Sequence, residues 1–172
     1  SPMIRYRPPQ KPSSKYISPE GEQALEEELN YLWKEERPKI TQSVSEAAAQ
    51  GDRSENAEYI YGKKRLREID RRVRYLSKRL EDAIVVSSAP DNTNKIYFGA
   101  KVTLEDEQGE TYTYRLLGAD EIDPKKGHIS IDAPLGRALL GKELDSEVEV
   151  NSPQGMKQYY VQAIEYIVGS EK

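Results

Sequence analysis

The sequence predicts an α+β protein, with an N-terminal long antiparallel two-helix coiled coil followed by a small antiparallel β domain that contains one short helix. Apolar residues recur at helical spacing up to about residue 86 and alternate as in strands beyond residue 95. A turn-rich segment separates the two patterns. Charged residues make up 33% of the 172 residues and apolar residues 36%, which suits an extended coiled coil better than one compact core.

The first predicted helix begins at Ser18, a suitable N-cap, with Pro19 in the first helical position. Pro38 lies inside the helical pattern, where it removes a backbone hydrogen bond. We therefore expect a kink or break close to Glu36 and Arg37. The apolar face of this helix recurs at spacings of three or four residues, with Glu36 interrupting it, and consists of Leu25, Leu29, Leu32, Ile40, Val44 and Ala47.

The second predicted helix has the more regular pattern, a heptad-like row of Tyr59, Gly62, Leu66, Ile69, Val73, Leu76 and Leu80. A second row lies on the opposite face of the same helix and is basic: Lys64, Arg67, Arg71, Arg74 and Lys78. We call this row the basic stripe. Such rows are usually solvated faces that pair with neighbouring acids. Because this helix has few acids of its own, contact with phosphate is an equally open alternative.

The second half of the chain reads as a separate domain. Residues 87–94 have the composition of a linker, and the domain is expected to span 95–169. Pro134 and Gly141 bound a predicted short helix, and His128 is expected to be structural rather than a ligand or a base. The predicted strands are 96–104, 112–117, 128–131, 147–150 and 159–167.

The composition excludes several kinds of site. Without cysteine there is neither a disulfide nor a thiolate metal site, which is compatible with the cytoplasm. No apolar run approaches the roughly 18 residues of a membrane helix, and nucleotide-binding motifs are missing, so we expect no membrane contact and no small-molecule substrate. Residues 1–17 are basic and proline-rich, and we expect them to form a disordered arm.

The predicted hairpin tip carries two carboxylates, Asp52 and Glu55, directly before the second helix. This spacing is typical of a capping box, in which both residues satisfy backbone groups at the helix start. Two neighbouring carboxylates are also suitable ligands for Mg²⁺. Two ligands are too few to hold the ion alone, so a metal role would require a second molecule that receives the tip. Both alternatives remain open.

Long motifs in both halves resemble the Gre family of bacterial transcript cleavage factors. The resemblance extends from about Ser18 to the C-terminus, and the dense basic run favours the more basic branch of that family. The motifs are LNYLW and EERP in the first helix, GDRSENAEY at 51–59, KKRLREIDRRVRYL at 63–76, and ISIDAP with RALL in the second domain.

The resemblance implies an FKBP-like second domain without isomerase activity. It implies an accessory factor, itself no enzyme, that binds backtracked RNA polymerase and stimulates its intrinsic Mg-dependent cleavage of the RNA 3′ end. The positions matching the family's contact with the β′ rim coiled coil, at the mouth of the secondary channel, are Asp132, Ala133 and Pro134. The implied role of the coiled coil is to reach down the channel.

In the family, the two tip acids help to hold the second Mg²⁺ of the polymerase active centre, and the matching residues are Asp52 and Glu55. Ser54 is suited to orienting a carboxylate or a water, and Asn56 and Tyr59 to supporting the tip or contacting RNA. The basic stripe would face the backtracked nascent RNA or acidic channel walls. Two alternatives are a channel-binding regulator without cleavage activity, and a prolyl isomerase or chaperone that acts through the second half.

Overall fold

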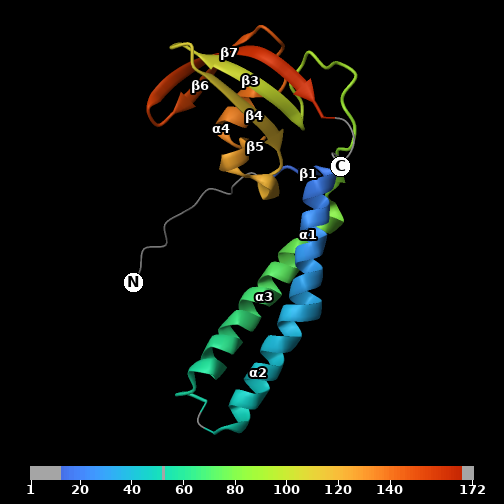
Figure 1. Cartoon of the computed structure of the whole chain (residues 1–172), viewed down its shortest axis with the longest axis vertical. Helices are drawn as coiled ribbons and strands as arrows, with labels where there is room; N and C mark the ends of the chain where they lie inside the picture. Colours follow the sequence, from blue (N-terminus) through green and yellow to red (C-terminus); the bar gives the residue numbers. More distant parts are fainter. Residues whose placement is uncertain (1–12, 52, 168–172) are drawn as a thin grey trace, which may run out of the picture. The chain divides into compact units, whose positions relative to one another are not determined.

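Figure 1 shows a computed structural model of the chain, which describes residues 13–51 and 53–167. It contains two compact units. The first, Lys15–Ser88, is a helical hairpin, and the second, Ala89–Ile167 together with residues 13 and 14, is built on a β-sheet. The predicted α+β class is confirmed.

The first arm of the hairpin is one helix with an irregular turn. The Ser18 hydroxyl caps its start by accepting the Gly21 N–H at 3.0 Å. In the irregular turn the Arg37 N–H donates to the Leu32 carbonyl, five residues back instead of four. Pro38 follows directly, and its ring would crowd a regular turn. The break expected near Glu36 is therefore a short stretch of π-helix, which we call the π-turn. The segments are α1 (Pro19–Tyr31), η1 (Leu32–Glu36) and α2 (Arg37–Ala49).

The second arm is helix α3 (Ala57–Asp82), which packs along the first through the predicted apolar row. Gly62 permits a close approach of the two helices, because a Cβ at this position would overlap the Cγ2 methyl of Val44. Leu29, Ile40, Val73 and Leu80 flank a buried core. The buried members of that core are Ile17, Leu25, Leu32, Ile69 and Leu76.

A two-residue parallel ladder joins the segment before the first helix to the segment after the second helix, at the base of the hairpin. Strand β1 (Tyr16–Ile17) pairs with β2 (Ile84–Val85). The assignment of residues 16 and 17 to a disordered arm is wrong, because Ile17 is fully buried against the apolar row of the helices. Residues 1–12 of the expected arm lie outside the described part of the chain.

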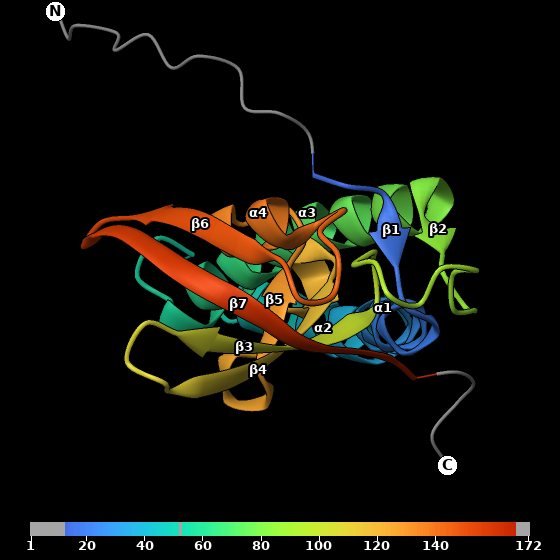
Figure 2. The same ribbon diagram turned by 90° about the horizontal axis from the view of Figure 1, so that it is seen from above.

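The second unit contains a five-stranded sheet with the order β5-β4-β3-β7-β6 (Figure 2). Gly109 and Gly155 have positive φ angles and make the two hairpin turns. The sheet is not wholly antiparallel as predicted, because β5 pairs parallel with β4 after a crossover through two short 3₁₀ turns. The strands are β3 (Ala100–Asp106), β4 (Thr111–Leu117), β5 (His128–Ser130), β6 (Glu147–Ser152) and β7 (Gly155–Tyr166).

The predicted short helix is α4 (Pro134–Leu139), and it lies against the end of β5. Gly136 permits this close approach, since a Cβ there would overlap the Ser130 carbonyl oxygen. Leu139 is fully buried. The short loop between β5 and α4 is consequently fixed at both ends.

Candidate functional site

Asn56 organises the hairpin tip. Its side-chain oxygen accepts the N–H groups of Glu58 at 3.1 Å and Tyr59 at 3.2 Å, which caps α3. Its amide nitrogen donates to the Ala47 carbonyl of α2 at 3.1 Å. One side chain therefore holds the end of the first arm against the start of the second.

The capping box expected from Asp52 and Glu55 is wrong for the helix start that the structure has. Helix α3 begins at Ala57, with Asn56 as its cap, and Glu55 lies in the preceding turn. Asn56 satisfies the first-turn donors with its own side chain, so these groups do not require a carboxylate. Asp52 lies outside the described residues.

Glu55 is exposed at the tip. Within residues 13–51 and 53–167, no hydrogen bond or ion pair involves its carboxylate. Beside it, the Arg53 guanidinium lies 5.7 Å from the ring centroid of the half-buried Tyr59. Ser54 is exposed in the same turn. The tip thus presents a carboxylate to solvent from a turn next to a capped helix.

All five residues of the basic stripe are exposed on α3. Lys78 pairs with Asp82 at 3.2 Å. The pKa of the Asp70 carboxyl is lowered mainly by its hydrogen bond with Arg37 and, to a smaller extent, by the charge of Arg74. Among the described residues, Lys64, Arg67 and Arg71 have no ion pair. The stripe therefore has unneutralised charge on its tip-proximal half.

The acids of the first arm pair with other arginines of α3. Arg65 contacts Glu36 through two nitrogens, at 2.7 and 2.9 Å, and the hydrogen bond lowers the pKa of the Glu36 carboxyl and raises that of Arg65. Arg72 contacts Glu28 in the same way, at 2.6 and 2.8 Å. Glu36, which interrupts the apolar pattern, thus bridges the two arms. Neither of these pairs uses a residue of the basic stripe.

The predicted docking residues lie together on the loop between β5 and α4. The Asp132 N–H donates to the Ser130 hydroxyl at 3.0 Å, and its carboxylate accepts the Ser14 N–H at 3.0 Å. Ala133 caps α4 and Pro134 opens it, exposed to solvent. The three residues form a continuous, well-anchored surface.

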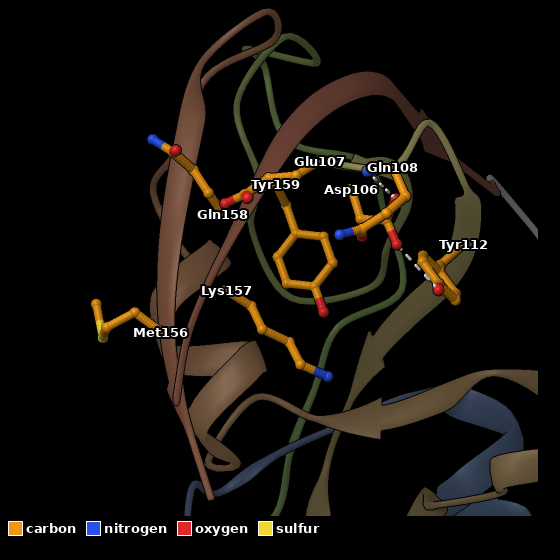
Figure 3. Close-up of a pocket in the computed structure, with 8 residues that line it drawn as sticks. All are labelled: Asp106, Glu107, Gln108, Tyr112, Met156, Lys157, Gln158 and Tyr159. Carbon is orange, nitrogen blue, oxygen red and sulfur yellow. Dashed lines mark hydrogen bonds between the residues drawn. The ribbon is translucent and has the colours of Figure 1, made fainter. Parts of the chain in front are cut away.

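A hollow of about 330 Å³ opens at the turn end of the same sheet (Figure 3). The Tyr159 ring and the Lys157 ammonium point into it, and Tyr112 donates a hydrogen bond to Asp106 at 3.2 Å, which raises the pKa of Tyr112. Glu107 also lines it. Pockets that bind apolar rings are mainly apolar, so this charged lining does not suit a proline ring.

His128 is half-buried in β5, and burial together with the nearby Arg115 lowers its pKa below the ordinary range. The backbone of His128 lies opposite that of Arg115 in the parallel β4–β5 ladder. In the described part of the chain, no cluster of three His, Cys, Asp or Glu residues could hold a metal ion. The Glu55 carboxylate has the hard oxygen donors that Mg²⁺ prefers, but it would need ligands from elsewhere.

Comparison with known proteins identifies the family. Residues 15–85 match the family description "Transcription elongation factor, N-terminal", and residues 90–166 match "Transcription elongation factor, GreA/GreB, C-term". The chain belongs to the GreA/GreB family. Membership in this family of transcription elongation factors implies an interaction with RNA polymerase.

Within the GreA/GreB family, the chain is 60% identical over 164 residues to transcription elongation factor GreB of Pseudomonas aeruginosa, covering 95% of this chain and 98% of the relative. It is 60% identical over 153 residues to GreB of Haemophilus influenzae, covering 89% and 97%. GreB of Yersinia pestis is also 60% identical, covering 89% and 90%. The resemblance inferred from the motifs is confirmed. None of the helices in the described ranges has the length and apolarity needed to span a membrane.

Proposed function

We propose that the protein stimulates the intrinsic, Mg-dependent cleavage of the RNA 3′ end by backtracked bacterial RNA polymerase, and so rescues arrested complexes. The observation that carries this proposal is the exposed Glu55 carboxylate at the tip of a hairpin in a GreA/GreB family member. The hairpin would enter the secondary channel and present its tip at the active centre. The protein acts as an accessory factor and is not a nuclease alone.

Asp52 and Glu55 would act as two of the oxygen ligands of an Mg²⁺ ion shared with the polymerase. When bound, a second Mg²⁺ activates water and neutralises charge on the phosphate. Asn56 keeps the tip fixed by bonding both helices, which limits the conformational freedom that is lost on insertion. The free protein would not hold the ion, because its own ligands are too few.

The other surfaces fit the same proposal. The fixed loop of Asp132, Ala133 and Pro134 would dock on the β′ rim coiled coil at the channel mouth. The exposed arginines and lysines of the basic stripe would contact phosphates of the backtracked nascent RNA, where several weak charge contacts add up. Docking and cleavage thus belong to different residues, so they can be tested separately.

The test uses backtracked elongation complexes with labelled RNA. We expect Glu55→Gln and Asp52→Asn each to slow stimulated cleavage about tenfold or more without weakening polymerase binding, and higher Mg²⁺ to recover part of the rate. Glu46→Gln is the matched control, since Glu46 is an exposed carboxylate of α2 that accepts a hydrogen bond from Gln42.

Cleavage that both tip variants leave unchanged would rule out the shared-metal mechanism. A wild-type protein that binds polymerase without stimulating cleavage would instead be a channel-binding regulator. Asp132→Ala should weaken binding and leave cleavage at saturating protein unchanged. Equal binding by this variant and the wild type would contradict the proposed docking loop.

A further inference from the structure

One side of the first arm carries a groove that neither the tip nor the docking loop uses. It has a volume of about 550 Å³ and lies over the π-turn and the start of α2. Trp33 is 53% exposed there, although a tryptophan ring is costly to leave in water. The groove is lined by Trp33, Arg37, Pro38, Thr41, Gln42 and Ser45.

Arg37 connects this groove to the basic stripe. Its guanidinium lies 5.3 Å from the centroid of the Trp33 ring. The same guanidinium donates to both oxygens of Asp70 on α3, at 2.8 and 3.4 Å. Arg67 and Arg74 lie one helical turn before and after Asp70. The indole and the exposed arginines are therefore neighbours on one side of the hairpin.

We propose that the Trp33–Arg37 groove stacks a base of the backtracked RNA while Arg67 and Arg74 contact its phosphates. This inference rests on the proposed function, which brings single-stranded RNA alongside the hairpin. Sites for single strands combine a positive surface with aromatic rings, because every base has a face that can stack. The ion pair with Asp70 fixes Arg37 beside the ring and so prepares the platform.

The chemistry of the groove favours RNA over a protein surface. The lining of the groove is mainly apolar, as stacking of a base requires, and it also carries hydroxyl, amide and guanidinium groups. The arginines beside it complement phosphate. Hydroxyl and amide groups suit base edges and the ribose 2′-hydroxyl.

The length of the hairpin sets which RNAs can reach the groove. Trp33 lies about 25 Å from the end of α2 at the usual helical rise, which corresponds to about seven nucleotides at a stacked spacing of roughly 3.4 Å. Cleavage should therefore depend on Trp33 only where the extruded RNA is long. Complexes backtracked by about two and by about ten nucleotides distinguish the cases.

The experiment compares wild type, Trp33→Ala and Trp33→Phe on both complexes. We expect Trp33→Ala to slow cleavage of the long extruded RNA about tenfold at subsaturating protein, to leave the short one unchanged, and Trp33→Phe to retain most of the rate. Equal loss on both lengths would assign Trp33 to a contact with polymerase, and no loss on either would make it an inert surface residue. Both results overturn the inference. Wild type that cleaves neither RNA would overturn the proposed function instead.

A second measurement reports stacking directly. Trp33 is the only tryptophan of the chain, so its fluorescence reports this groove alone. At low salt, a single-stranded oligoribonucleotide should quench the emission with the same midpoint as the anisotropy change of a labelled copy. Binding by anisotropy without quenching, or no binding at low salt, would contradict the proposal.

Discussion

The close approach of Gly62 to Val44 predicts that Gly62→Ala destabilises the hairpin. Alanine favours a helix interior over glycine by about 1 kcal/mol, so propensity alone predicts a gain. The added Cβ, however, would overlap the Val44 Cγ2 methyl, and a valine in a helix has essentially one χ1 rotamer in which to move. Overpacking costs about 1–3 kcal/mol. We expect a net loss of about 1 kcal/mol in the free energy of unfolding.

Urea unfolding followed by helical circular dichroism measures this loss, because most of the helical residues lie in the hairpin. Val44→Ala is the matched control. On its own it should destabilise by removing a half-buried side chain, but in the Gly62→Ala background it removes the overlap. We expect a coupling of about 1 kcal/mol or more between the two sites. A Gly62→Ala variant more stable than wild type, or strictly additive effects, would refute the argument.

Three further changes test the interactions that hold the hairpin together. Asn56→Ala should lower the free energy of unfolding, measured in urea, by about 1–2 kcal/mol, since it removes the α3 cap and the hydrogen bond to Ala47. We call these two contacts the Asn56 clamp, and an unchanged urea midpoint would contradict it. Ile17→Ala should cost about 2–4 kcal/mol in the same assay because Ile17 is fully buried, whereas a freely moving arm would show no change. Arg65 lowers the pKa of Glu36 below its ordinary 4.5, so this pair stabilises fully above that pH and the effect is lost as the pH falls through the lowered value. Glu36→Gln should reduce the loss of unfolding free energy on acidification. If the unfolding free energies of the variant and of the wild type fall equally with pH, this contribution is excluded.

The sequence predicted the features that depend on local pattern. The Ser18 cap, the break before Pro38 and the heptad row of α3 each follow from a few neighbouring residues and from backbone geometry. The short helix opened by Pro134 is of the same kind. In these places local preference and tertiary packing agree, so pattern alone is sufficient.

The features that the sequence did not predict depend on distant partners. Ile17 belongs to a strand because it pairs with Val85 of β2, 68 residues later in the chain. The parallel β4–β5 pair likewise depends on a crossover. At the tip, Asn56 is the cap of α3, and its side chain also reaches Ala47 across the hairpin. The motif could place Glu55 at the tip, but its exposure there required the structure.

The β1–β2 ladder has a mechanical consequence. At the base, the Ile84 N–H donates to the Lys15 carbonyl at 2.8 Å and the Val86 N–H to the Ile17 carbonyl at 2.9 Å. Arg79 adds two bonds to the carbonyls of Lys15 and Tyr16. Sliding one helix past the other by a single residue would break this register, just as it would break the Asn56 clamp at the opposite end. The hairpin is thus locked against shear at both ends, and an axial push at its base would reach the tip without being lost to slippage between its arms.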